Sequence, residues 1–244
     1  MRHRFAITSN VEKFLGGVQV VDERGASEAS MLLVTGDPGY GKTSTVQWWA
    51  AQHGAVYLRA KASYTPHWML TELVRELGHA PARRSEDLFA QAMGVLARDP
   101  RPLVIDEVEH ALHDSRVLES VRDLTDMTEV TTVLVGMEHV QAKIARFAQI
   151  SSRIAAVVHF SAATVEDVRV CCDTVCEVGV ADDLVAEIHR QAAGRLREVM
   201  NAIAQVERVG KASGAKLVEL SMIGKQRLVH DWQRRASVTV RGRV

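Results

Sequence analysis

Eight consecutive residues, Gly36 to Thr43, have the types and spacing to bind phosphate. They read Gly-Asp-Pro-Gly-Tyr-Gly-Lys-Thr, which matches the pattern Gly-x-x-x-x-Gly-Lys-Ser/Thr in full. An apolar run, Met31 to Thr35, precedes them and a helical pattern follows, as a phosphate loop requires. Backbone N–H groups of such a loop surround phosphate oxygens, and the helix N-terminus adds positive potential. The segment therefore predicts binding of a nucleoside triphosphate.

The residues of this loop have separate expected roles. Lys42 is expected to reach the β- and γ-phosphates, and the Thr43 hydroxyl to ligate Mg²⁺. The expected nucleotide contacts are Gly36, Asp37, Pro38, Gly39, Tyr40, Gly41, Lys42, Thr43 and Ser44.

Two acids follow a second apolar run and supply candidates for hydrolysis. Leu103 to Ile105 predict a buried strand, and Asp106 and Glu107 come at its end. We expect Asp106 to hold Mg²⁺ through its water shell and Glu107 to polarise the attacking water as general base. Paired with the phosphate loop, and with one extra strand between the two, this element is typical of ATP-hydrolysing proteins rather than of Ras-like GTPases.

The elements that position these residues alternate between strands and helices. Five short apolar runs predict strands: 31–35, 55–59, 103–106, 132–135 and 155–160. Helical patterns lie between them, so we expect an α/β fold in which a parallel five-stranded sheet has helices on both faces. From Thr164, which begins a capping-box pattern, no strand signal remains, and three helical patterns follow at 164–178, 181–193 and 195–213. The expected organisation is a nucleotide-binding core (1–162), a helical lid (163–225) and a basic tail (226–244).

Charge is balanced over the chain and uneven along it. The 30 Lys and Arg residues equal the 30 Asp and Glu residues, but the segment from Arg195 onward carries eleven basic and four acidic residues, a net charge of +7. Such asymmetry favours a nucleic-acid partner, although basic residues that merely solvate helices would give the same count. No apolar run has the roughly 20 residues of a membrane helix and no signal sequence is evident, so we expect no membrane association. The three cysteines, Cys171, Cys172 and Cys176, lack a fourth ligand at metal-site spacing.

With its phosphate loop and Asp106-Glu107 pair, the chain resembles the AAA+ superfamily. Ser151-Ser152-Arg153-Ile154 looks like the Ser-Arg-Cys element of clamp loaders, which implies that Arg153 is an arginine finger acting on a neighbouring subunit's γ-phosphate, with Arg146 as the reserve. A surface Arg at a helix end is the alternative for Arg153. Gly194-Arg195-Leu196-Arg197 is similar to the Gly-x-x-Arg of initiator-type relatives, which implies that Arg197 contacts the nucleotide of its own chain.

The end of the fourth strand departs from the AAA+ pattern. Many relatives have a polar residue there that orients the attacking water, whereas this chain has Gly136 and Met137. Glu138 or His139 is the remaining candidate for that hydrogen bond. The departure predicts slow, switch-like hydrolysis.

Within AAA+, the chain resembles the DNA-transposition ATPases: the B protein of Mu-like phages, the TnsC and IstB groups, and the wider ExeA-like family. The stretches Leu134 to Glu138 and Arg146 to Ile154 carry this resemblance. It implies ATP-dependent assembly, as a filament or ring, on double-stranded DNA in the cytoplasm of a bacterial host, delivery of target DNA to a transposase, and release by slow hydrolysis. A helicase loader or replication-initiation ATPase, and a secretion-assembly ATPase that does not bind DNA, are the alternatives.

The DNA contacts are expected at two places. Lys61, in the loop after the second strand, and the nearby Arg59 form the first, and Arg234 and Arg235 in the basic tail form the second. Such cations would bind backbone phosphates without reading bases, so that binding depends strongly on salt. Simple solvated charge is the other interpretation of each pair.

Overall fold

The computed structural model describes residues 1–224 and 226–229, which form two compact units. Residues 9–161 make up the first, here called the sheet unit. Residues 1–8 join those from Ala162 onward in the second, here called the helical unit. Arg234 and Arg235 lie outside the described residues.

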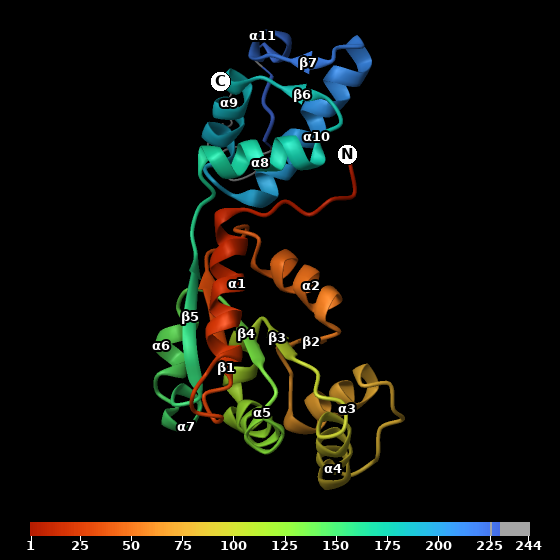
Figure 1. Cartoon of the computed structure of the whole chain (residues 1–244), viewed down its shortest axis with the longest axis vertical. Helices are drawn as coiled ribbons and strands as arrows, with labels where there is room; N and C mark the ends of the chain where they lie inside the picture. Colours follow the sequence, from red (N-terminus) through yellow and green to blue (C-terminus); the bar gives the residue numbers. More distant parts are fainter. Residues whose placement is uncertain (225, 230–244) are drawn as a thin grey trace, which may run out of the picture. The chain divides into compact units, whose positions relative to one another are not determined.

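A parallel five-stranded sheet forms the centre of the sheet unit (Figure 1). Its strands are β1 (Met31–Gly36), β2 (Val56–Arg59), β3 (Leu103–Asp106), β4 (Thr132–Val135) and β5 (Ile154–Phe160). They lie in the order β2-β3-β4-β1-β5, so β4 separates the strand before the phosphate loop from the strand that ends in Asp106. The predicted fold class, with its parallel sheet, is confirmed.

Alternate residues of the strands pack on opposite faces of the sheet. Leu32 and Val34 of β1 face helices α1 (Ser9–Asp22) and α2 (Lys42–His53), where they meet Phe14. Leu33 belongs to the core of the other face, which is covered by three longer helices and several short elements. Those elements are α3 (Pro66–Glu76), α4 (Ser85–Leu96), the 3-10 helix η1 (Val108–His113), α5 (Ser115–Thr128), α6 (Val140–Ile144) and α7 (Ala148–Ser151). Burial on both faces explains why the strands are continuous apolar runs rather than alternating ones.

Two helix starts follow the capping signals in the sequence. The Thr65 hydroxyl accepts a hydrogen bond from Trp68 N at 3.2 Å, and Pro66 is the first residue of α3. Thr164 and Asp167 form a complete capping box at the start of α8 (Val165–Val175). Each cap satisfies N–H groups that would otherwise lack partners in the first turn.

The helical unit contains α8 with α9 (Asp182–Ala192), α10 (Leu196–Ser213) and α11 (Leu220–Ile223). The expectation that this part has no strands is wrong: β6 (Gly179–Val180) pairs in parallel with β7 (Leu217–Val218). Strands of two residues are too short to show a period in the sequence. The unit's core includes Cys171, Cys172 and Cys176, all three buried with free thiols, and burial raises the pKa of Cys171 and of Cys172 to about 12.

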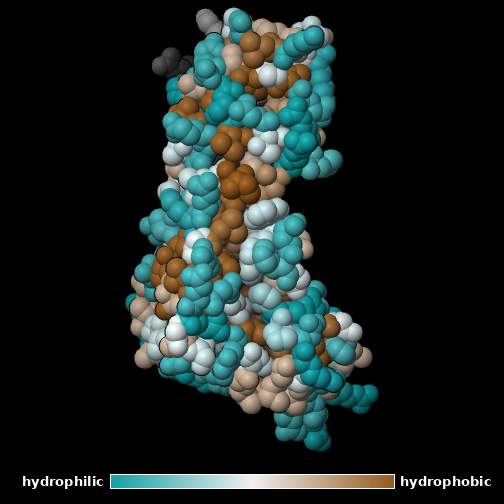
Figure 2. Space-filling view, viewed as in Figure 1, coloured by the Kyte–Doolittle hydropathy of each residue, from teal (hydrophilic) through white to brown (hydrophobic). Residues whose placement is uncertain are grey.

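Hydrophilic residues cover much of the face drawn in Figure 2, with hydrophobic ones showing between them. Of the helices that the structure describes, none is long and apolar enough to cross a membrane. The large hydrophobic side chains that are exposed in the sheet unit include Val20, Trp68, Met127 and Val157.

Candidate functional site

The phosphate loop connects β1 directly to α2. Gly39 and Gly41 have φ angles of 90° and 91°, in the left-handed region that residues with a Cβ rarely adopt. Gly41 is also the N-cap of α2, with no side chain to cap it, so the helix begins at Lys42 with its first N–H groups facing the loop. The geometry provides backbone donors and the positive end of a helix at one place, which suits a phosphate.

Lys42 folds back over its own loop. Its Nζ donates to the backbone oxygens of Gly36 at 2.6 Å and Asp37 at 2.9 Å. Burial lowers the pKa of Lys42, while the negative charges of Glu109, Asp106 and Asp37 oppose that shift. The ammonium is therefore held beside the loop by carbonyl oxygens, which are weaker partners for it than phosphate oxygens.

Asp106 is buried at the end of β3, with 2% of its surface exposed. Its Oδ1 accepts a hydrogen bond from Glu107 N at 2.9 Å, and its Oδ2 accepts one from the Tyr57 hydroxyl at 2.7 Å. Burial, and then this bond to Asp106, raises the pKa of Tyr57. Both oxygens of the carboxylate are thus oriented by donors, and each keeps a lone pair for a further ligand.

Glu107 is strained in its backbone and engaged in its side chain. Its φ of 54° lies in the left-handed region, which non-glycine residues occupy mainly at turns and functional sites. Its carboxylate forms an ion pair with Arg59, and His110 Nε2 lies 4.0 Å from its Oε2. Arg59 reaches Glu107 because it lies opposite the preceding residue, Asp106, in the pairing of β2 with β3. The hydrogen bond from Arg59 lowers the pKa of Glu107, which makes the carboxylate a weaker base.

Lys61 is also paired. It forms an ion pair with Glu72 of α3, and its Nζ lies 5.0 Å from the centre of the Trp68 ring and 5.4 Å from that of Tyr64. The Tyr64 hydroxyl donates to Glu72 at 2.8 Å. Both predicted DNA contacts that the structure describes, Arg59 and Lys61, therefore have carboxylate partners, and a DNA phosphate would compete with those partners for them.

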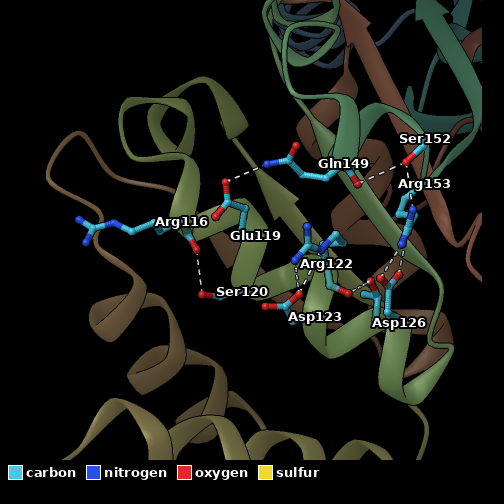
Figure 3. A network of polar contacts seen from close by, with 10 residues as sticks. Arg116, Glu119, Ser120, Arg122, Asp123, Asp126, Gln149, Ser152 and Arg153 are labelled. Atoms are coloured by element: carbon cyan, nitrogen blue, oxygen red, sulfur yellow. Dashed lines mark hydrogen bonds and ion pairs between the residues drawn. The ribbon is translucent and has the colours of Figure 1, made fainter.

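Arg153 lies at the start of β5 and is held by α5. Its Nε and Nη2 donate to the two carboxylate oxygens of Asp126 at 3.0 and 2.9 Å, and its Nη1 donates to the Ser152 hydroxyl at 3.0 Å (Figure 3). Met31, the first residue of β1, pairs with Ile154. Arg153 therefore lies at the opposite end of the sheet from the phosphate loop, so within this unit it does not reach the loop.

The other predicted arginines lie elsewhere. Arg146 is exposed just after α6, and Arg197 is exposed in the first turn of α10, in the helical unit. The role of Arg197 at the nucleotide stays a prediction. At the end of β4, Glu138 lies 4.0 Å from His159 of β5, whose Nδ1 is 3.3 Å from the Thr35 hydroxyl.

Three partners of the predicted residues were not identified from the sequence: Tyr57 and Glu109 near the phosphate loop, and Asp126 beside Arg153. Tyr57 is a strand residue of unremarkable type, and its bond to Asp106 depends on the register between β2 and β3. Asp126 is one of several acids on α5. Glu109 comes two residues after Glu107, and this closeness was the only hint available in the sequence.

The chemistry of the donor set fits Mg²⁺ bound together with a nucleotide. A hydroxyl oxygen (Thr43) and a buried carboxylate (Asp106) are hard ligands, and Mg²⁺ commonly completes its shell with phosphate oxygens and water. Among residues 1–224 and 226–229, no group of three His, Cys, Asp or Glu residues forms a cage for a metal ion.

Comparison with known proteins agrees with this geometry. Residues 24–144 match the protein family described as AAA domain, a range that includes β1 to β4, the phosphate loop and the Asp106-Glu107 pair. No curated protein sequence matches the chain.

Several solved structures share the fold. Cdc6p from Pyrobaculum aerophilum has a TM-score of 0.58 and 18% identity over 77% of this chain. Orc1 from Aeropyrum pernix, solved in complex with DNA, has a TM-score of 0.61 and 13% identity over 91%. The RuvB Holliday junction branch migration motor of Thermotoga maritima has a TM-score of 0.61 and 18% identity over 90%. The chain spans 57%, 65% and 68% of the length of these three proteins.

Proposed function

We propose that this chain, whose residues 24–144 match the AAA domain, is an ATPase that assembles on double-stranded DNA and delivers target DNA to a transposase. The observation that carries the ATPase part is the convergence of the phosphate loop, Lys42, Asp106 and Glu107 at one edge of a parallel sheet. The DNA part is supported by Arg59 and Lys61 in the sheet unit and by the DNA complex of Orc1, which shares the fold. The transposition part rests on the resemblance described from the sequence.

Binding of ATP begins at the phosphate loop. Lys42 exchanges the carbonyl oxygens of Gly36 and Asp37 for phosphate oxygens, which are charged and bind the ammonium more strongly. Thr43 and Asp106 are the residues that would hold Mg²⁺, which neutralises phosphate charge when bound. Tyr57 keeps the Asp106 carboxylate oriented for that role.

Hydrolysis requires Glu107 to leave Arg59. While the ion pair persists, the carboxylate is a poor base and is turned towards the guanidinium. A DNA phosphate that binds Arg59 removes the partner of Glu107, which can then accept a proton from water. The same competition makes hydrolysis slow without DNA and faster with it.

A second copy of the chain completes the site. Arg153 lies at the far end of its own sheet, and Asp126 holds its Nε and Nη2. Nη1 and Nη2 each carry a second hydrogen, which can donate to a phosphate bound by another copy of the chain. ATP between two copies therefore stabilises their association, and an arginine in this position stabilises the charge of the transition state.

Electron microscopy of the protein with linear double-stranded DNA tests the proposal. ATP is expected to give filaments or rings on the DNA, whereas ADP, no nucleotide and Lys42→Ala with ATP are expected to give none. Arg153→Ala is expected to bind ATP and to lose assembly and most stimulated hydrolysis. If ATP binds and no DNA complex forms at low salt, the DNA half of the proposal is wrong and only the nucleotide site remains.

A further inference from the structure

One acidic oxygen at the nucleotide site has no hydrogen-bond partner among the residues that the structure describes. Oε2 of Glu109, in the first turn of η1, is buried, and none of the described residues donates a hydrogen bond to it. A buried carboxylate oxygen without a donor is costly, and native structures rarely retain one without a functional reason. The position of the oxygen indicates which partner it awaits.

The oxygen lies against the end of β4. A Cβ added to Gly136 would be 2.7 Å from Val140 Cγ2, 2.9 Å from Glu109 Oε2 and 3.0 Å from Val108 Cγ1, which is closer than real Cβ atoms normally approach. The missing side chain at Gly136 therefore leaves room for the carboxylate and for these two valines. Gly136 N donates to Val34 O of β1 at 3.0 Å, two residues before the phosphate loop begins. The Glu109 carboxylate thus lies at the edge of the sheet that carries the loop.

The place of Glu109 in the chain agrees with this position. It comes three residues after Asp106, in the 3-10 helix η1 whose N-cap is Glu107. Bare carboxylate oxygens and phosphate oxygens repel each other, so an O–H group between them is the favourable arrangement.

We infer that Glu109 is a second acid of the hydrolysis site. Its Oε2, which is closed to water in this structure, accepts a hydrogen bond from the attacking water once ATP has drawn Lys42 to its phosphates. The inference rests on the proposed ATPase function. In the step, the water oxygen forms a bond to the γ-phosphorus and the bond from that phosphorus to the β–γ bridging oxygen breaks. Glu107 takes one proton of the water, while Glu109 accepts a hydrogen bond from the other hydrogen without taking it. Glu109 and Gly136 together replace the polar side chain that the end of β4 lacks.

Glu109→Gln tests this role because it keeps the size of the side chain and removes its charge. The loss of one charged hydrogen bond in the transition state is expected to lower kcat by about 10- to 100-fold. The affinity for a fluorescent ATP analogue is expected to stay equal or to rise slightly, because the variant removes a negative charge near the phosphates. The Mg²⁺ concentration for half-maximal binding is expected to stay unchanged. The unfolding temperature is expected to stay equal or rise, because a buried carboxylate oxygen without a donor has been replaced by a neutral amide.

Gly136→Ala tests the same contact from the other side. Its new Cβ displaces Oε2 and is expected to lower kcat like Glu109→Gln. Because that Cβ also crowds two valines, the matched control is Gly210→Ala in α10, whose added Cβ would be 2.8 Å from Val218 Cγ2 and which is expected to leave kcat unchanged. In a double-mutant cycle, Gly136→Ala is expected to cost little further kcat once Glu109 is Gln.

The outcomes separate this inference from the function on which it rests. If the parent protein hydrolyses ATP and Glu109→Gln hydrolyses it equally well, the inference is wrong and the ATPase proposal stands. A shift in Mg²⁺ half-saturation with unchanged kcat, or a fall in unfolding temperature that accounts for the lost activity, also overturns it. If the parent binds ATP and never hydrolyses it, both proposals are wrong.

Discussion

The hydrogen bond from Tyr57 to Asp106 gives a prediction that needs no measurement of hydrolysis. Tyr57→Phe removes only the hydroxyl, which donates at 2.7 Å to a carboxylate whose residue is 2% exposed. Hydrogen bonds to charged groups contribute about 1.5–3 kcal/mol. Because Tyr57 is itself half-buried, water replaces part of the lost bond, and we expect a loss of about 2 kcal/mol of unfolding free energy.

Two measurements follow from that change. A loss of about 2 kcal/mol corresponds to a fall of roughly 4–8 °C in the unfolding temperature of a domain of this size. In addition, groups that orient a metal ligand typically change metal affinity by 10–100-fold. Titration of Mg²⁺ against a fluorescent ATP analogue is therefore expected to show half-maximal binding at an Mg²⁺ concentration roughly tenfold higher in Tyr57→Phe.

Tyr64→Phe is the matched control. Its hydroxyl also donates to a carboxylate, Glu72 at 2.8 Å, and Tyr64 is 3% exposed. We expect this variant to lose stability by a similar or smaller amount, because Glu72 keeps Trp68 and Lys61 as donors. Its Mg²⁺ titration should match that of the parent. The reasoning is refuted if Tyr57→Phe titrates like the parent, or if both variants shift the Mg²⁺ titration equally.

Two further predictions concern ion pairs. Arg59→Ala is expected to raise ATP turnover without DNA by about two- to fivefold, because it frees Glu107 and exposed ion pairs are weak. Arg84→Ala, which removes another exposed ion pair, should leave turnover unchanged, and a fall in turnover in Arg59→Ala would contradict the reasoning. In the helical unit, the hydrogen bond from Arg190 lowers the pKa of Glu187 to about 2. The ionised Glu187 therefore stabilises the fold at pH values above its ordinary pKa of about 4.5, and this stabilisation is lost as the pH falls from about 4.5 towards 2. Thermal unfolding measured from pH 7 to pH 2 should show the parent more stable than Glu187→Gln at pH 7, with the difference in unfolding temperature shrinking below about pH 4.5. A difference that stays constant with pH would exclude the ion pair as its cause.

The parts of the fold that the sequence revealed are those with strong local signals. The strand Leu103–Asp106 is apolar up to its last residue because both faces of the sheet are covered. Helix α3 begins at Pro66 because the hydroxyl of Thr65 caps it. The strands β6 and β7 stayed hidden because each has two residues and gains its pairing only from the other. Local pattern therefore predicts elements that are stable by burial or capping, and it misses those that depend on distant contacts.

The candidate site divides in the same way. The phosphate loop was predictable residue by residue, since its function is carried by a contiguous backbone segment. The partners of its side chains were not, because Arg59 meets Glu107 through strand register and Arg153 meets Asp126 across 27 positions of sequence. Arg59 and Lys61 were predicted as cations for DNA, and their carboxylate partners became visible only in the folded chain.

The separation of Arg153 from the phosphate loop along the sheet has a consequence for any assembly of this chain. In the assembly proposed above, the surface that supplies Arg153 and the surface that binds the nucleotide are different parts of one molecule. Each interface would therefore join unlike faces and have a direction. An open row then contains one complete active site fewer than it has subunits, and its terminal molecule keeps ATP without a neighbour's arginine. ATP would be hydrolysed at the interfaces within such a row and would persist on that terminal molecule. The subunits at the two ends of one row would therefore stay bound for different times.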